Sequence, residues 1–301
     1  MNPAAKWIRR LSPSVAKADL TRFVRDLLKA NTVVNALFTP ADADTVVPLS
    51  HPGNFTRQSI FRVAVSNERV SGEMLPLPPV KLQYYKAQGG TDRYLTTGRA
   101  DAEVIRQYLD RLGVRLNGIS VMDWGCRDCR VLRHFASDAR VCEFWGVDQH
   151  GPSMEWAKAS LSPPFRFVTC SAYPHLPFED RKFKLVLAYS VFTHIEHLRD
   201  MWLMEISRIT AKGGIFLATI HDEHTIAYFQ QTGKPCWIPP GVSLASLLRH
   251  EVSIISGLDW GNCYTFFLSD WAIREFGRYF EVLAIRPRAE DYQTALILRK
   301  R

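Results

Sequence analysis

The sequence predicts a doubly wound α/β fold, in which a mostly parallel, seven-stranded sheet ends in an antiparallel hairpin. Between residues 119 and 220, short apolar runs alternate with helical patterns, which is typical of parallel βαβ units. Near the C-terminus, two strand-like runs are separated by too few residues for a helical crossover, so they predict the hairpin. The 301 residues, 47% of them hydrophobic, suffice for one such domain with an accessory segment.

The predicted elements follow one another in a regular order. The pattern predicts a helix over residues 102–112, with Ile105, Tyr108 and Leu109 on one side and Gly113 as the stop signal. The expected strands are residues 119–123, 143–148, 165–170, 183–188 and 215–220, and the expected helices between them are 130–136, 153–160 and 198–210. The closing hairpin joins 280–285 to 294–298.

Residues 1–83 are expected to form an appendage to the domain, which spans 84–301 and carries an insertion at 222–270. Residues 14–38 combine an apolar and a cationic helical face. This helix either packs on the domain with its charges in solvent, or docks on an anionic partner or an anionic membrane surface. Residues 39–79 are expected to be irregular or to form a small β element, and the prolines of Leu75-Pro-Leu-Pro-Pro79 predict an extended connector.

The net positive charge comes almost entirely from the first third of the chain. Residues 1–100 hold 14 Lys and Arg against 7 Asp and Glu, whereas the remaining residues hold 24 against 23. A nucleic-acid groove across the main domain is therefore disfavoured. Apolar runs reach only strand length, and Arg9-Arg10 is not followed by an apolar segment, so we expect a cytoplasmic protein. The six cysteines lack disulfide-framework spacing and are expected to be reduced.

A candidate ligand crevice follows the first two strands. Residues 121–130 read as a strand entering a turn, and Gly125 permits close backbone approach there. The second strand ends in Asp148, 25 residues after Asp123, where a carboxylate can accept hydrogen bonds from both hydroxyls of a ribose. The spacing indicates a nucleoside-binding crevice, and the alternative for Asp148 is a helix cap.

The chain resembles class I S-adenosylmethionine-dependent methyltransferases over roughly residues 84–300, in particular bacterial enzymes that act on small molecules or sugars. A Rossmann oxidoreductase is disfavoured by residues 190–194 and by the terminal hairpin. Five landmarks occur in family order: the turn at 121–130, Gly146-Val-Asp148, Leu176-Pro-Phe178 with the strand to His194, Trp202 to Arg208, and Lys212-Gly-Gly214.

The resemblance implies a Rossmann-like fold and S-adenosyl-L-methionine as the cofactor. The turn after the first strand would face the methionine portion, Asp148 the ribose, and Ser171 with Ala172 the adenine. The full set of implied cofactor-binding residues is Asp123, Gly125, Cys126, Arg127, Asp148, Gln149, Ser171, Ala172 and Tyr189.

The glycine-rich motif is altered, because Arg127 and Cys129 stand where the family has glycines. If Arg127 has negative φ, it points outward and its cation can approach the cofactor carboxylate. If φ is positive, the arginine costs about 1–2 kcal/mol relative to glycine. Ser171, Lys184 and Ala211 also replace an acid, an Asp and a Pro that are frequent in the family. These departures support a second hypothesis, a catalytically lapsed fold that serves as a binding or scaffold protein.

His194 is the candidate base that deprotonates the methyl acceptor, and a structural role is its alternative. His221-Asp-Glu-His224 can line the acceptor site or hold a metal, although four polar residues on a loop are more often solvated. Cys126-x-x-Cys129 suggests a zinc or redox pair, but no second ligand pair follows it, so small residues in a turn are the favoured interpretation and no metal is expected. Trp237, Trp260 and Tyr264 in the insertion suit a lid or a satellite core. The expected acceptor is a small molecule or a glycan sugar, with RNA as the alternative.

Overall fold

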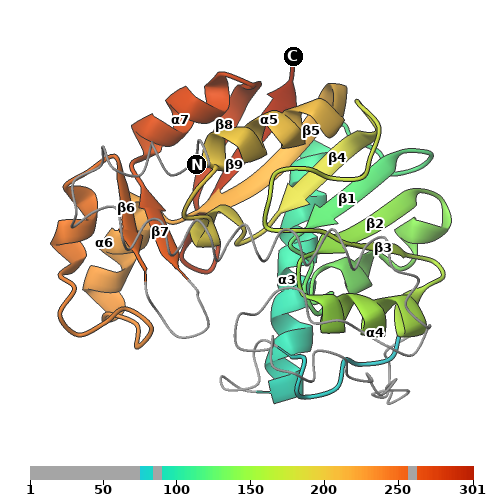
Figure 1. Ribbon diagram of the computed structural model, residues 1–301, viewed down its shortest axis with the longest axis horizontal. Helices are drawn as coiled ribbons and strands as arrows, with labels where there is room; N and C mark the ends of the chain where they lie inside the picture. The colour runs from blue at the N-terminus through green and yellow to red at the C-terminus, as the bar shows by residue number, and fades with distance from the viewer. Residues whose placement is uncertain (1–74, 84–89, 257–262) are drawn as a thin grey trace, which may run out of the picture.

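The computed structural model describes residues 75–83, 90–256 and 263–301. The predicted basic helix at 14–38, the segment 39–74 and Trp260 lie outside the described residues. Within them, one sheet has the strand order β3-β2-β1-β4-β5-β9-β8 (Figure 1). The parallel strands are β1 (Ser120–Trp124), β2 (Glu143–Asp148), β3 (Arg166–Thr169), β4 (Phe183–Ala188) and β5 (Thr210–Ile220). The antiparallel hairpin consists of β8 (Phe280–Glu290) and β9 (Gln293–Lys300), and β9 pairs with β5.

Helices cover both faces of the sheet because its buried strands present apolar side chains on both sides. On β4, Leu185 and Leu187 face one core, while Val186 and Ala188 face the other. The first core includes residues of α3 (Gly90–Arg111) and α4 (Gly151–Leu161), and the second includes residues of α5 (Arg199–Ile209) and α7 (Ser269–Gly277). The predicted doubly wound fold is therefore confirmed.

The predicted element boundaries agree best with those of the structure where strands are short and buried. β2 and β4 have the predicted limits, and β5 begins five residues earlier than predicted, at Thr210. Helix α3 begins at Gly90, well before the predicted Ala102, and ends ahead of Gly113, whose φ of +67° is left-handed. The segment 75–79 forms neither helix nor strand, as its prolines predict.

The predicted helix at 130–136 is wrong. The chain forms two short 3₁₀ helices there, Leu132–Phe135 and Asp138–Arg140. Cys129, directly before this stretch, has a φ of +62°. The Arg133 guanidinium is buried and donates to the carbonyl oxygens of Leu75 (2.8 Å) and Pro76 (3.1 Å). These tertiary bonds fix the segment in place of a regular helix.

A polar clamp joins α5 to the loop before β4. Arg208 pairs with the Glu205 carboxylate (2.7 Å) and donates to the carbonyls of Leu176 (3.1 Å) and Phe178 (2.7 Å). Glu205 in turn accepts from the Leu176 N–H (2.6 Å). The two landmarks that resemble the methyltransferase family in this region therefore contact each other.

The insertion after β5 is structured and has its own small core. It contains α6 (Glu223–Thr232), a 3₁₀ helix (Leu244–Leu248) and the two-stranded sheet of β6 (Val252–Ile255) and β7 (Tyr264–Phe267). Phe266 of β7 pairs with His221 at the end of β5. The predicted satellite core is present, and it includes Ile226, Phe229, Ile238, Leu247, Ile255 and Phe266.

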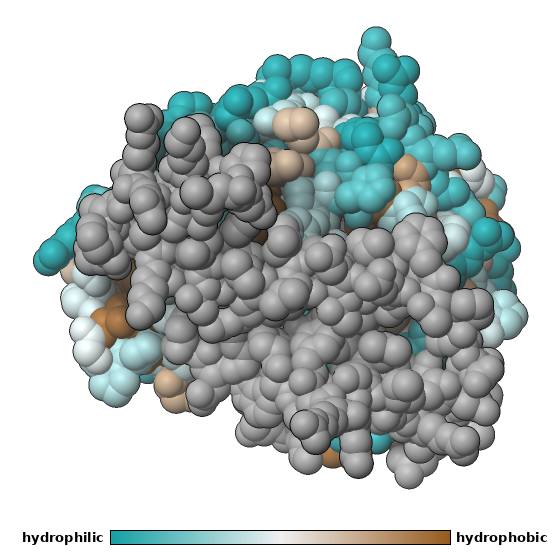
Figure 2. All heavy atoms as spheres, viewed as in Figure 1, coloured by the Kyte–Doolittle hydropathy of each residue, from teal (hydrophilic) through white to brown (hydrophobic). Residues whose placement is uncertain are grey.

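The described part of the face in Figure 2 is mainly hydrophilic, with scattered hydrophobic residues. No helix in the described ranges combines the length and apolar character needed to cross a bilayer.

We predict that Gly98→Ala destabilises the fold. Alanine normally favours a helix interior, but a Cβ at Gly98 would lie 2.2 Å from the carbonyl oxygen of Arg130, which is backbone and cannot swing away. We expect a loss of about 1–3 kcal/mol in the free energy of unfolding, measured by urea denaturation. Gly241→Ala is the control, because nothing lies within 4 Å of its added Cβ. Equal stability of both variants would contradict the tight contact between α3 and Arg130.

Candidate functional site

The predicted site residues gather at the carboxyl-terminal edge of the parallel strands. β1, β2, β3 and β4 are neighbours in the sheet, and the turns after them carry Gly125 to Arg127, Gln149, Ser171 with Ala172, and Tyr189 respectively. The turn after β1 is tied to β2, since the N–H groups of Gly125 (2.7 Å) and Cys126 (3.3 Å) donate to the Val147 carbonyl. Ligands of open α/β sheets bind at this edge.

The turn after β1 keeps the backbone conformation of a glycine-rich loop although only one glycine remains. Gly125, Arg127 and Cys129 have φ values of +83°, +43° and +62°. Of the two alternatives for Arg127, the strained one therefore holds, and it costs about 1–2 kcal/mol. Gly125 cannot be replaced without displacement, because a Cβ there would lie 2.4 Å from Cγ2 of Val191.

Asp148 locks this turn from the end of β2. Its Oδ2 accepts from the Arg127 N–H (2.9 Å) and its Oδ1 from the His150 N–H (2.7 Å). Burial raises the pKa of the Asp148 carboxyl, against the charge of Arg127 and the backbone donors. The helix-cap alternative is wrong, because His150 is the N-cap of α4. A carboxylate offers about four acceptor positions, so bonding to the turn leaves capacity for a ligand.

Asp123, at the end of β1, is a second buried carboxyl, 4% exposed. Burial raises its pKa to about 7, Arg130 lowers it, and the negative charge of Asp148 raises it further. Arg130 itself pairs with Asp101 of α3. Two neighbouring acids with perturbed ionisation at a strand edge are typical of a binding site.

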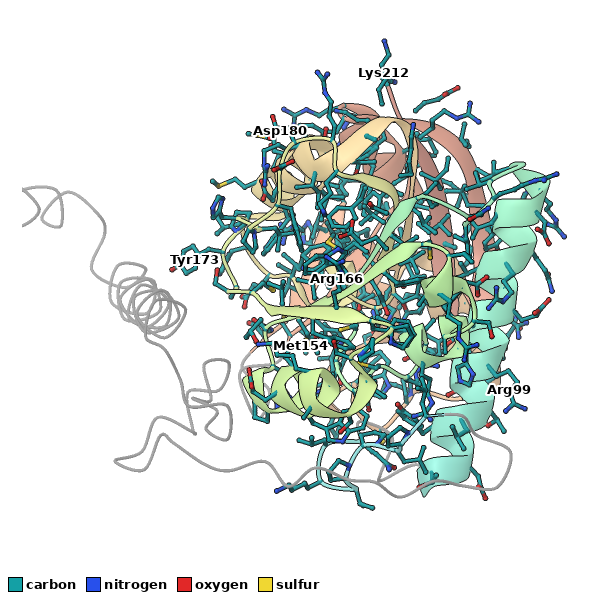
Figure 3. All side chains as sticks on the ribbon, turned by 90° about the vertical axis from the view of Figure 1, so that its right-hand side faces the viewer. Arg99, Met154, Arg166, Tyr173, Asp180 and Lys212 are labelled. Carbon is teal, nitrogen blue, oxygen red and sulfur yellow. The ribbon has the colours of Figure 1, made fainter. Side chains whose placement is uncertain are left out.

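The residues expected near adenine lie beyond β3. The Ser171 hydroxyl accepts from the Tyr173 N–H (3.0 Å), so it also serves the local turn. Ala172 and Gln149 are exposed, and Tyr173 projects outward from the body of the protein (Figure 3). Tyr189 follows β4 and is buried.

His194 lies in the 3₁₀ helix Phe192–His194, just past β4. Its Nδ1 is 2.9 Å from the Cys263 carbonyl oxygen, which can only accept, so Nδ1 carries the proton and Nε2 holds a lone pair. Burial lowers the pKa of His194, and the charge of Arg127 lowers it further despite the hydrogen bond to Cys263. The side chain is therefore a neutral imidazole whose Nε2 lone pair can accept a proton.

A polar network behind the turn after β4 was not anticipated from the sequence. Ser190, at φ +55°, receives the Gln293 amide on its hydroxyl (2.9 Å) and donates its N–H to Thr219 (2.7 Å). Thr219 donates to the Gln293 side-chain oxygen (2.6 Å). The sequence signal that could have indicated this network is the presence of polar Thr219 and Gln293 in the otherwise mainly apolar strands β5 and β9.

His221 is not solvated. The side chain is 1% exposed and surrounded by aromatic rings, and burial, together with the proximity of His194, lowers its pKa to about 3. The next three residues bring ligand atoms within 4.8 Å of one another. However, the Asp222 carboxylate caps α6 by accepting from the His224 and Thr225 N–H groups, and it also accepts from the Ser269 hydroxyl (3.0 Å). Both carboxylate oxygens of Asp222 therefore already accept hydrogen bonds from the protein.

The thiols of Cys126 and Cys129 are buried and free, and burial raises both of their pKa values. They serve as small residues that line the turn.

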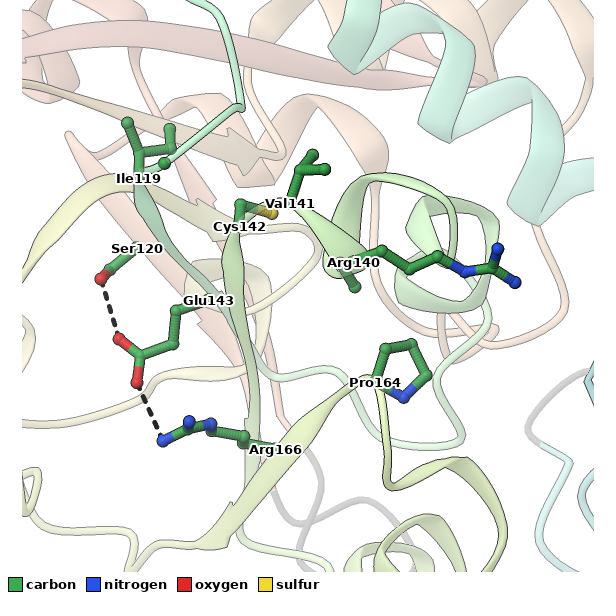
Figure 4. Close-up of a pocket in the computed structure, with 10 residues that line it drawn as sticks. Ile119, Ser120, Arg140, Val141, Cys142, Glu143, Pro164 and Arg166 are labelled. Carbon is green, nitrogen blue, oxygen red and sulfur yellow. Dashed lines mark hydrogen bonds and ion pairs between the residues drawn. The ribbon is translucent and has the colours of Figure 1, made fainter.

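A hollow of about 390 Å³ lies at the opposite, amino-terminal edge of the sheet (Figure 4). It is lined by Ser120, Glu143 and Arg166, and the Glu143 carboxylate already binds the Ser120 hydroxyl (2.9 Å) and Arg166 (3.1 Å). This hollow is separate from the strand ends that bear Asp148.

Residues 122–218 match the family model described as a methyltransferase domain. The matched segment runs from β1 to β5, so it contains the turn, Asp148 and His194. This match and the strand order agree with the resemblance to class I methyltransferases that the sequence indicates. No curated protein matches the chain.

Solved structures share this fold. A protein from Pyrococcus horikoshii OT3, PH0226, is 16% identical with a TM-score of 0.52, over 72% of this chain and 98% of its own. An S-adenosylmethionine-dependent methyltransferase from Clostridium acetobutylicum is 9% identical with a TM-score of 0.51, over 72% of this chain and 94% of its own.

We predict that Asp123→Asn changes the pH dependence of stability. The carboxyl has a pKa of about 7 in the folded protein, against roughly 3.9 when unfolded. Between these values the folded state binds more protons, so wild-type stability falls as pH rises toward 7 and then levels. The Asn variant lacks this loss and should be more stable at pH ~8 by roughly 1–4 kcal/mol, with little difference near pH ~4. Urea unfolding at both pH values measures this, and an equal difference at both would refute the assignment.

Proposed function

We propose that the protein transfers a methyl group from S-adenosyl-L-methionine to a small molecule or a glycan sugar. The observation that carries the proposal is the left-handed turn after β1, which Asp148 holds in a strained, glycine-like conformation at the ligand-binding edge. Strain of this kind persists where surrounding contacts enforce it, and such residues cluster at functional sites. The methyltransferase domain match and the fold shared with the clostridial enzyme support the same cofactor.

The site residues take distinct roles in this proposal. Gly125, Cys126 and Arg127 face the methionine portion through the backbone of the turn. Asp148 and Gln149 hold the ribose, Ser171 and Ala172 lie beside the adenine, and Asp123 and Tyr189 complete the walls of the site.

The sulfonium of the cofactor supplies a methyl group with an excellent leaving group. The protein therefore has to align the acceptor with the methyl group and remove the acceptor proton. His194 is suited to the second task, because the Cys263 carbonyl fixes its Nδ1 proton and leaves Nε2 as the base. Its lowered pKa keeps the imidazole unprotonated at neutral pH.

Two alternatives remain testable. The substitutions at Arg127 and Cys129 suit a lapsed fold that binds or scaffolds, although both residues have the positive φ that glycine adopts most easily. The excess of Lys and Arg in residues 1–100 suits an RNA methyltransferase. Strongly salt-dependent RNA affinity that is lost on deletion of residues 1–38 would favour RNA as the acceptor.

We predict that purified protein binds S-adenosylmethionine and S-adenosylhomocysteine at micromolar concentration by calorimetry. Asp148→Ala should weaken binding by at least roughly tenfold, since both the ribose acceptor and the lock on the turn are lost. Asp148→Asn, which keeps the side-chain shape, separates loss of charge from loss of packing. Asp110→Ala, at an exposed acid on α3, is the matched control. No binding at millimolar ligand to folded wild-type protein would overturn the enzyme and support the lapsed fold.

A further inference from the structure

His221 is a buried polar side chain without a partner. It follows β5 directly, and neither of its ring nitrogens has a hydrogen-bond partner among the described residues. The Thr265 backbone beside it raises its pKa, but burial and His194 lower it, and no contact of the ring nitrogens with the described residues has hydrogen-bond geometry. An imidazole that is 1% exposed and unpaired carries a desolvation cost, which points to a use other than stability.

Four aromatic rings form a cage around His221. The Trp237 ring is nearly parallel to the imidazole (centroids 5.7 Å apart, 20° between planes), and Phe266, Tyr292 and Tyr264 lie at 5.0, 5.6 and 6.5 Å. Trp237 and Tyr264 also pack together, with centroids 4.2 Å apart. We call these four rings with His221 the His221 cage. Its members come from the end of β5, the insertion and the turn before β9.

The cage adjoins the candidate base. The Tyr264 ring lies 5.3 Å from the His194 ring, and the carbonyl that holds His194 belongs to Cys263, the residue before Tyr264. His194 also influences the ionisation of His221 directly. A molecule held in the cage would therefore lie beside the proposed base.

We propose that the His221 cage is the acceptor subsite and takes a flat, uncharged aromatic ring that bears a hydroxyl group. This inference rests on the proposed methyl transfer. The rings supply stacking surfaces, and the neutral imidazole supplies a nitrogen that accepts from the hydroxyl. Trp237, on the connection between α6 and the following 3₁₀ helix, is only half-buried, and in this proposal the ring enters from this side.

The chemistry of the cage favours this class over a sugar or an anion. None of the four rings is charged, and the low pKa of His221 keeps it neutral at physiological pH, so a carboxylate or phosphate gains no ion pair. A pyranose would bury several hydroxyls against aromatic surface with few partners, which is costly. A hydroxyaromatic ring needs only one polar contact.

The test is calorimetric titration of the full chain with β-naphthol, with and without saturating S-adenosylhomocysteine. Naphthalenesulfonate and methyl glucoside are the charged and the sugar probes. His221→Phe keeps a ring of similar shape but removes the acceptor nitrogen, and we expect β-naphthol to bind about tenfold more weakly. His250→Phe, at an exposed histidine of the same insertion, should bind as wild type. Trp237→Leu, which removes the stacking wall, should also weaken binding.

A second readout separates a binding role from a structural one. If His221 serves a ligand, His221→Phe removes a buried unpaired polar group and should raise the Tm by about 2–4 °C. Unchanged β-naphthol affinity in both cage variants, or preference for methyl glucoside or naphthalenesulfonate, would overturn the subsite. Binding of S-adenosylhomocysteine without binding of β-naphthol would also overturn it and leave the proposed function standing. Cage binding of β-naphthol without any S-adenosylhomocysteine binding would instead refute methyl transfer and the acceptor assignment with it.

Discussion

The bond between the Asp148 carboxylate and the Arg127 N–H is the constraint on which the candidate site depends. An arginine at φ +43° is unfavourable by itself, and a buried carboxylate is unfavourable without donors. Each satisfies the other, since the left-handed backbone turns its N–H toward Asp148 and the carboxylate gains a donor. The turn after β1 can therefore keep a glycine-like path without its second and third glycines. The hydrogen bond that offsets the backbone strain of Arg127 is thus the same bond that fixes Asp148 at the candidate ligand edge.

Burial of two acids side by side is unfavourable for stability, and the surrounding cations offset only part of it. The charge of Asp148 raises the pKa of Asp123, while Arg130 lowers the pKa of Asp123 and Arg127 lowers that of Asp148. Arg130 is itself held by Asp101 of α3, so this helix stabilises the charge balance at the strand edge. Such an arrangement persists where a site needs acceptors that are already fixed in place before the ligand arrives.

The sheet was predictable because its strands are buried on both faces, and their apolar runs mark their own limits, as in β2 and β4. Local patterns failed where tertiary bonds decide the backbone. Residues 130–136 have helical spacing, yet the chain forms 3₁₀ turns there, which the bonds of Arg133 to Leu75 and Pro76 hold in place. Helix α3 extends back to Gly90, where Tyr94 packs with Leu77 and its hydroxyl donates to the Asp128 carbonyl (2.7 Å). Neither contact has a signal in local sequence.

The two halves of the candidate site differ in whether local sequence places their residues. The cofactor side follows the order of the chain, so Asp123, Gly125 and Asp148 could be placed from strand ends alone. The His221 cage combines residues 221, 237, 264, 266 and 292, and only the folded insertion brings them together. The insertion is nevertheless anchored to the sheet, because the Phe267 N–H donates to the His221 carbonyl (2.8 Å). Changes in the loops between α6 and β7 can therefore alter the shape of the cage. The end of β5 and the turn that Asp148 holds would keep their positions, because both are fixed by the main sheet.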